Sequence, residues 1–279
     1  MAEKEKKDQY IVAYIADYGH TDTVLSYSVL MSRHLRKGII LLRICDPRYT
    51  DETTDEAQKK LVGLKATLPD DVFATYCALK GDTAEVIELL PKAFNAVAIV
   101  GHVDKTSRKS ACHPRNLLRD FGKCKVAYLL AQQPIGDHAA IGKVGFSLDF
   151  KKESKDKLVW ASYFPRFFGS ALYALSYNYT DEFLRAKWQS NVQFMEKMYK
   201  NLNITCRHAD VGKPKMFLDV EALNVAQQLG LGLMICTTTA ERDVMEYFIG
   251  VQEQRTIANK YKIPILFINP RDDLYVLCD

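Results

Sequence analysis

The sequence predicts an α/β fold built from two doubly wound, open parallel sheets of five strands each. Short apolar runs without polar alternation recur along its 279 residues, which is typical of strands buried on both faces of a parallel sheet. Segments with apolar residues at helical spacing separate these runs, and such alternation favours right-handed strand–helix–strand crossovers. The same order of elements then begins again, at a distance too long for a solenoid repeat and long enough for a whole domain.

Each expected element of the first half rests on an apolar run or a helical stripe. Residues 10–16 form an apolar run that ends at Asp17. Asp82 is expected to cap the helix that continues to Phe94, because its side chain can accept a hydrogen bond from a free backbone N–H. The expected strands are 10–16, 39–45, 72–79, 96–100 and 125–131, and the expected helices are 24–35, 54–67, 82–94 and 114–121.

The second half repeats this order, which predicts two domains, residues 8–136 and residues 137–279. The expected strands are 144–148, 170–176, 204–209, 231–236 and 263–268, and the expected helices are 154–164, 181–201, 212–229 and 240–260. Three pairs of residues stand at matching places in the two halves: Asp17 with Asp149, Gly81 with Gly212, and Gly101 with Cys236.

Composition and charge exclude several classes of protein. The formal net charge of +4 is small for this length and the basic residues are spread along the chain, so we expect no nucleic-acid partner. The sequence contains no run of eighteen apolar residues and begins with charged residues, so we expect neither membrane insertion nor a signal peptide. The seven cysteines form no C-x-x-C pair and their number is odd, which favours a reduced, cytoplasmic location.

Two further motifs have both a functional and a structural interpretation. Cys112-His113 could be a nucleophile with its base, but adjacent residues rarely face each other in a catalytic geometry, so the structural interpretation is preferred. The aromatic stretch 160–168 could contact a partner or a lipid, but a buried helix end with a turn at Pro165 is the more common case. The six histidines show no spacing typical of a metal site.

Three segments of the first half resemble the universal stress protein family. Residues 11–17 resemble the opening strand of that family with its terminal Asp, and residues 41–47 resemble its second strand with an Asp-Pro exit. The most specific match is Gly81-Asp82-Thr83-Ala84-Glu85-Val86-Ile87, which is very similar to the start of the family's third helix. The resemblance implies a tandem of two such domains, each Rossmann-like and of the adenine nucleotide alpha hydrolase-like type, with strand order 3-2-1-4-5.

This strand order predicts the place of a site. The order reverses between the first and fourth strands, and ligands of open α/β sheets bind at the carboxyl ends of the strands beside such a reversal. We expect Asp17 there to accept hydrogen bonds from a hydroxyl or an amine, and Ile44 to cover one face of a base. The candidate residues of this anion or nucleotide crevice are Asp17, Ile44, Gly101, Lys105, Arg108, His113 and Arg115.

The chain departs from the glycine-rich phosphate loop of the family. The second glycine is replaced by Asp104, which would repel a phosphate, and the third falls near Pro114, which has no N–H. In the second half, Cys236 stands where the first glycine would be. The basic side chains that follow Gly101 could hold an anion in place of backbone groups, or could be a solvated loop.

These observations predict a non-catalytic universal stress protein, acting as a stress-response scaffold, sensor or binding module without a cofactor. The alternative is a switch that binds ATP or AMP in the first domain and hydrolyses ATP slowly. A regulatory partner of a membrane transporter stays open, and the identity of any protein partner is unknown. The apolar fifth strands, Val126–Leu130 and Ile265–Ile268, are expected to pair the two domains internally, and a homodimer through another face stays open.

Overall fold

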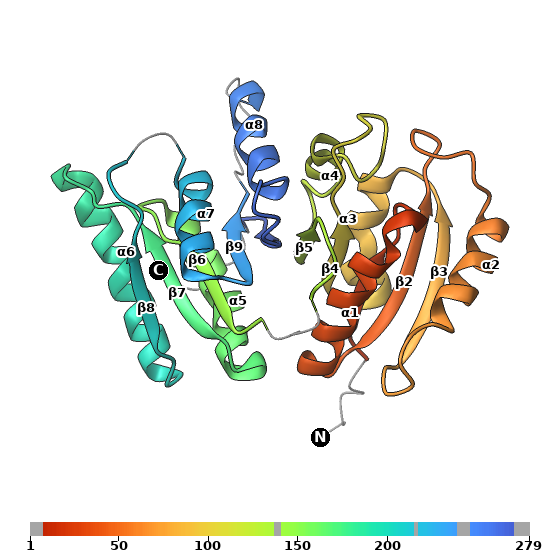
Figure 1. Cartoon of the computed structure of the whole chain (residues 1–279), viewed down its shortest axis with the longest axis horizontal. Coiled ribbons are helices and arrows are strands. Elements are labelled where there is room, and N and C mark those ends of the chain that lie inside the picture. The colour runs from red at the N-terminus through yellow and green to blue at the C-terminus, as the bar shows by residue number, and fades with distance from the viewer. Residues whose placement is uncertain (1–7, 137–140, 215–216, 239–245, 271–279) are drawn as a thin grey trace. The chain divides into compact units, whose positions relative to one another are not determined.

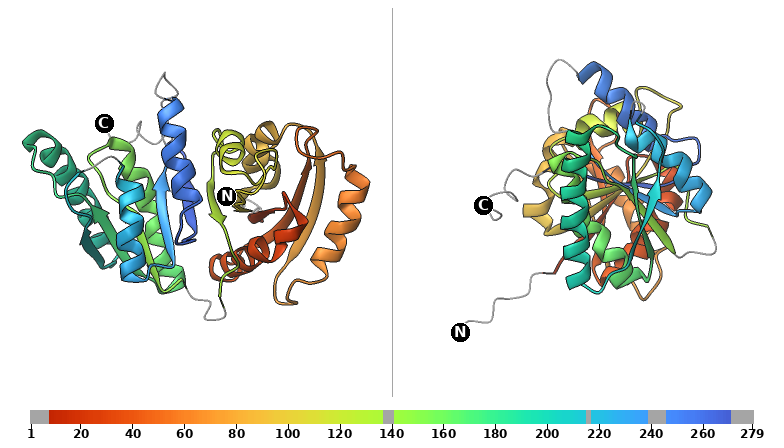
Figure 2. Two further views of the ribbon diagram at one scale, coloured as in Figure 1. Left: turned by 45° about the horizontal axis from the view of Figure 1, so that its top comes forward. Right: turned by 90° about the vertical axis from the view of Figure 1, so that its left-hand side faces the viewer.

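The computed structural model describes residues 8–136, 141–214, 217–238 and 246–270, with the side chains of 246–251 left out. The chain divides into two compact units, Met1–Asp137 and His138–Asp279. Each unit is an α/β structure with helices flanking a sheet of parallel strands (Figures 1 and 2). None of the helices in the described part of the chain is long and apolar enough to cross a membrane.

The sheet of the first unit has the order β3-β2-β1-β4-β5, and every described pair of neighbouring strands is parallel. This confirms the predicted order 3-2-1-4-5. Helix α1 packs on β1 and β4, α2 on β2 and β3, and α3 on β4. The elements are β1 (Tyr10–Tyr14), α1 (Thr21–Leu35), β2 (Gly38–Cys45), α2 (Thr54–Lys65), β3 (Ala74–Lys80), α3 (Thr83–Phe94), β4 (Ala96–His102), α4 (Pro114–Asp120) and β5 (Ala127–Ala131).

The sheet of the second unit has the order β8-β7-β6-β9-β10, which is the same topology. Helix α5 packs on β6 and β9, and α7 contacts β6, β7 and β9. The elements are β6 (Lys143–Ser147), α5 (Asp156–Tyr163), β7 (Ala171–Ser176), α6 (Glu182–Asn201), β8 (Cys206–Asp210), α7 (Leu218–Leu229), β9 (Leu233–Thr237), α8 (Glu246–Ile257) and β10 (Ile265–Ile268).

Local capping chemistry explains where several helices begin. The Asp82 side chain accepts hydrogen bonds from the backbone N–H groups of Ala84 and Glu85, as predicted from the sequence. Thr53 and Glu56 form a reciprocal capping box at the start of α2, which satisfies backbone donors that the helix leaves free. Such caps fix the loops between strand ends and helix starts, and these loops surround the crevice of the first unit.

Two details of the second unit differ from the sequence prediction. Helix α7 begins at Leu218 and not at Gly212, because Pro214 disfavours helical backbone in the residue before it and Phe217 is extended. The aromatic stretch does not turn at Pro165, since a π-helical segment, Phe164–Phe168, continues α5 and ends at Gly169, whose φ is 68°. Residues 240–245 of the predicted helix 240–260 lie outside the described residues.

Candidate functional site

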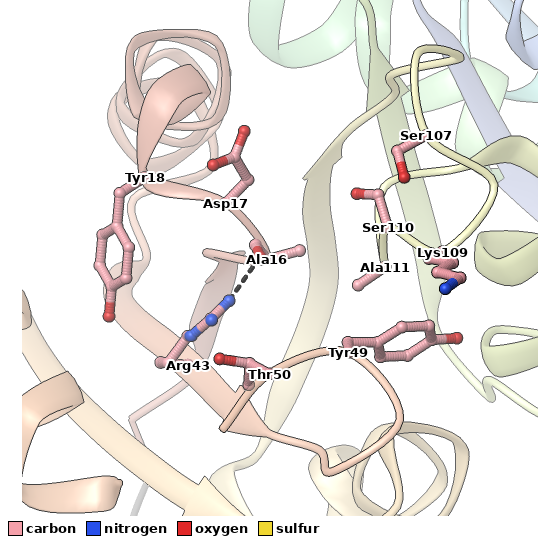
Figure 3. Close-up of a pocket in the computed structure, with 10 residues that line it drawn as sticks. All are labelled: Ala16, Asp17, Tyr18, Arg43, Tyr49, Thr50, Ser107, Lys109, Ser110 and Ala111. Carbon is pink, nitrogen blue, oxygen red and sulfur yellow. Dashed lines mark hydrogen bonds between the residues drawn. The ribbon is translucent and has the colours of Figure 1, made fainter. Parts of the chain in front are cut away.

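A cavity of about 350 Å³ lies in the first unit at the carboxyl ends of β1 and β2. In Figure 3 Arg43 of β2 and residues of the segments after β1 and β2 line one wall, and Ser107, Lys109, Ser110 and Ala111 of the loop after β4 line the facing wall. The strand order reverses between β1 and β4, so the cavity lies where the fold predicts a ligand. The lining residues are Ala16, Asp17, Tyr18, Arg43, Tyr49, Thr50, Ser107, Lys109, Ser110 and Ala111.

Arg43 contributes a buried cation to this cavity. It projects from β2, and its side chain is only 9% exposed. Its Nε donates to Glu52 Oε2 at 2.8 Å, and its Nη1 donates to the backbone carbonyls of Ile15, at 3.1 Å, and Ala16. The guanidinium therefore occupies the carboxyl end of β1 and satisfies carbonyl groups that the ladder leaves unpaired. The aromatic ring of Tyr18 lies 5.2 Å from its Cζ.

Asp17 lines the same cavity, and its carboxylate forms hydrogen bonds with residues that follow it closely in the sequence. Its Oδ1 accepts from the backbone N–H of Gly19 at 3.0 Å, and its Oδ2 lies 2.5 Å from His20 Nδ1. Burial would raise the pKa of Asp17, but the hydrogen bonds from Gly19 and His20 outweigh it and hold the pKa below its usual value. Asp17 is therefore an ionised acceptor at the crevice.

A stacked pair of histidines stands beside Asp17. The rings of His20 and His102 are 4.0 Å apart and tilted by only 10°. His102 is 5% exposed, and its Nδ1 has no hydrogen-bond partner among the described residues. Burial, together with the charge of the neighbouring His20, lowers the pKa of His102 to about 4. His102 is therefore neutral at physiological pH.

The loop between β2 and α2 forms the floor of the cavity and is held by several charged contacts. Arg48 contacts the carboxylates of Asp46, at 2.5 Å, and Asp82, at 2.9 Å. The Tyr49 hydroxyl donates to Asp120 Oδ2 at 2.6 Å, which fixes the tyrosine ring against the cavity. Charged and hydrogen-bonded contacts to the buried carboxylates of Asp46 and Asp120 therefore hold this loop in place.

The seven candidate residues lie in different environments. Asp17 lines the cavity, whereas Ile44 is 3% exposed and lies outside the cavity lining, because successive residues of a strand face opposite sides and Arg43 takes the cavity side. Gly101 lies within β4, where an added Cβ would be 3.1 Å from Leu130, so packing alone explains this glycine. Lys105, Arg108 and Arg115 are exposed, and the His113 side chain accepts from the Arg115 N–H at the start of α4.

Several polar residues of the cavity lining were not among the seven candidates. Ser107, Lys109 and Ser110 belong to the same loop as Lys105 and Arg108, and they are the members that line the cavity. Arg43 could have been found as the one charge inside an otherwise apolar strand run, since a buried arginine needs partners.

The reversal point of the second unit is built differently. Lys157 of α5 is 2% exposed, and its Nζ donates to Ser147 Oγ at 2.9 Å at the end of β6. Cys236, which stands where the first unit has Gly101, is fully buried, and burial raises the pKa of its thiol. A buried lysine and a buried cysteine thus lie at the ends of β6 and β9 in the second unit.

The Cys112 thiol of the Cys112-His113 motif is buried. Burial raises the pKa of the Cys112 thiol to about 12, which opposes a role as nucleophile. Within the described residues, no cluster of three or more histidine, cysteine or acidic side chains could hold a metal ion.

Comparison with known proteins identifies the fold. No protein-family model matches this sequence, and no curated protein sequence matches it. Among solved structures, a universal stress protein from Archaeoglobus fulgidus DSM 4304 is 13% identical, with a TM-score of 0.68 and 95% of this chain and 97% of that one covered. The chain has the fold of the universal stress proteins.

Two structures from Pseudomonas aeruginosa agree with this. A protein of unknown function from strain PAO1 is 13% identical, with a TM-score of 0.64 over 96% of this chain and 94% of that one. A protein from strain UCBPP-PA14, whose name also places it with the universal stress proteins, is 13% identical, with a TM-score of 0.63 over 96% and 95%. These similarities confirm the resemblance seen in the sequence at the level of the fold.

Proposed function

We propose that this chain is a non-catalytic binding module with the universal stress protein fold, acting as a stress-response scaffold or sensor. Its nucleotide crevice is degenerate. The observation that supports this most directly is Arg43, whose guanidinium takes the end of β1 and is bonded to Glu52. A ligand in the cavity would contact side chains at this position. It would not contact the backbone N–H groups of a glycine-rich loop, which are the groups that bind a triphosphate.

The test is a titration of the intact chain with MgATP and with AMP, together with an assay for released phosphate. We expect dissociation constants weaker than about 0.1 mM, because the Asp104 carboxylate would repel a phosphate and Pro114 has no backbone N–H to donate. We expect no phosphate release above the rate of a heat-denatured sample. Micromolar binding of MgATP would contradict the proposal.

A switch that binds ATP or AMP in the first unit is the second candidate. It is favoured by Asp17 and Lys109, since both line the cavity at the reversal of strand order. Under this hypothesis the Asp17→Asn variant binds AMP more weakly than the parent chain does. A slow ATPase would also require phosphate release that depends on Mg²⁺ and disappears in the same variant.

We also propose that the two units pair internally through their last strands. Strand β5 is the edge of the first sheet and β10 is the edge of the second, and all their side chains are apolar. An apolar sheet edge that stays open is prone to aggregation, so each unit has a physical reason to cover it. The covalent link gives one unit an effective concentration of about 1 mM near the other, which favours even weak pairing.

A further inference from the structure

The cavity of the first unit carries charges of both signs on facing walls. Arg43 and Asp17 come from the β1 and β2 side, and Lys109 comes from the loop after β4. Asp17 is an ionised acceptor, as described above. A highly charged anion such as a triphosphate would meet this carboxylate at close range and would also approach Glu52, which is bonded to Arg43.

Arg43 retains hydrogen-bonding capacity toward the cavity. Its Nε and Nη1 are engaged by Glu52 and by the carbonyls of Ile15 and Ala16. Its Nη2 makes no hydrogen bond to the described residues, and a guanidinium has five N–H donors in a fixed plane. A buried cation held in one orientation by its other contacts is suited to bind one carboxylate or phosphate group.

Asp17 likewise retains acceptor capacity. A carboxylate has about four lone-pair positions, and Asp17 uses one on the Gly19 N–H and one on His20. The hydroxyl groups of Ser107 and Ser110 line the opposite wall, where they can bind either a donor or an acceptor. The volume of about 350 Å³ lies at the lower end of the roughly 300–1,000 Å³ that small-molecule sites span.

We propose that this cavity binds a compact zwitterion, a small molecule with one carboxylate or phosphate group and one ammonium group. The acid group lies between Arg43 and Lys109, and the ammonium group lies at Asp17. This assignment rests on the proposed function as a binding module and names the class of its ligand. It separates the site from adenine nucleotides, which carry several negative charges and no ammonium group.

The experiment uses matched probes that differ only in the ammonium group. O-phosphoethanolamine is compared with ethyl phosphate, and β-alanine with propionate, each titrated into the intact chain and followed by calorimetry or NMR. We expect the ammonium-bearing member of at least one pair to bind about 10-fold more tightly than its partner, because it alone satisfies Asp17. Which pair responds decides between phosphate and carboxylate as the acid group.

Variants locate the binding. Lys109→Ala is expected to weaken the better probe about 10-fold, and this exposed residue can be changed without disturbing the core. Lys105→Ala is the matched control, since Lys105 is an exposed lysine of the same loop outside the cavity lining, and it should bind as the parent does. Asp17→Asn should abolish the preference for the ammonium-bearing probe, and the acid-only probe should bind at least as tightly as it does to the parent chain, because a nearby negative charge is removed.

Several results would overturn the inference. Equal affinity within both probe pairs, or an unchanged affinity in Lys109→Ala, contradicts the zwitterion site. If neither these probes nor nucleotides bind at concentrations up to about 10 mM, this inference fails. The proposed function would still stand in that case, because it requires only that nucleotides do not bind tightly. If MgATP binds at micromolar concentration and loses affinity in Asp17→Asn, both fail.

Discussion

Replacing Arg43 by methionine should destabilise the first unit by about 3 kcal/mol, through the loss of a buried ion pair. Methionine keeps most of the apolar stem, so the cost is mainly electrostatic. The change leaves the Glu52 carboxylate, whose side chain is 8% exposed, without its arginine partner, while Lys60 Nζ still contacts it at 2.7 Å. It also leaves the carbonyls of Ile15 and Ala16 without their donor.

The magnitude follows from these contacts. Removing one partner of a buried ion pair costs about 3–5 kcal/mol, because the other charge stays buried. Lys60 still compensates Glu52 in part, although the Lys60 side chain is 54% exposed and its contribution is screened by water. We therefore expect the lower end of that range, or a drop of about 10 °C in Tm for a unit of this size.

The assay is urea unfolding of the intact chain, with Arg43→Met, Glu52→Met and the double variant forming a cycle. The double variant should be more stable than Arg43→Met, since replacing both charges by apolar groups removes the unpaired carboxylate. Lys60→Ala is the control for an exposed cation and should cost less than about 1 kcal/mol. If Arg43→Met costs as little as Lys60→Ala, or the double variant shows no recovery, the buried pair does not hold the end of β1.

Three further predictions concern pH, the second unit and the domains. The pKa of His102 is lowered from 6.5 to about 4 in the folded chain. The free energy of unfolding should therefore be constant with respect to this group above pH 6.5 and should decrease as the pH falls toward 4, because protonation then favours the unfolded chain. The loss should approach about 3 kcal/mol, and urea midpoints of His102→Gln should depend less on pH over that interval than those of the parent. Lys157→Met should be neutral or stabilising by about 1–2 kcal/mol in thermal unfolding, because it removes a buried charge and keeps the volume; a loss of stability would show that the ammonium group is needed. Residues 1–136 and 137–279 expressed separately should be poorly soluble, or should associate when mixed, because each has an open apolar edge strand; two soluble monomers that ignore each other would refute internal pairing.

The sequence could predict the fold because its signals are local and repeated. Apolar runs without alternation predicted buried parallel strands, and the Asp82 cap predicted the start of α3, as the structure confirms. The predicted start of α7 at residue 212 is wrong, although Gly212 stands where the first half has Gly81. Pro214 two residues later imposes extended backbone before it, and that local rule overrides the analogy.

The sequence predicted where in the fold the cavity lies, but only some of the residues that line it. Asp17 follows directly from the end of a strand at the reversal of order, so the sequence placed it correctly at the cavity. Ile44 and Arg43 are adjacent, and which of them faces the cavity depends on the register of β2, which a strand run without alternation does not reveal. Within the loop after β4, the choice of Lys109 over Lys105 depends on a loop conformation set by tertiary contacts.

The aromatic stretch 160–168, which spans the end of α5 and the π-helical segment, shows a similar limit. Phe164 is buried, but Phe167 is 45% exposed, so the stretch is neither wholly core nor wholly surface. The rings of Tyr163 and Phe167 lie 5.8 Å apart, which shields part of each from water. A run of aromatic residues cannot show from its order alone which rings point inward, because the π-helical segment changes the spacing from that of an α-helix.

The nucleotide content of the protein as it is isolated from cells tests the central claim most directly. The intact chain is purified without added nucleotide and denatured, and the released small molecules are identified by absorbance and mass spectrometry. A crevice that is lined by Arg43 and lacks the glycine loop predicts less than about one nucleotide per ten chains, as expected for dissociation constants weaker than about 0.1 mM. Stoichiometric ATP or AMP in that sample would contradict the account.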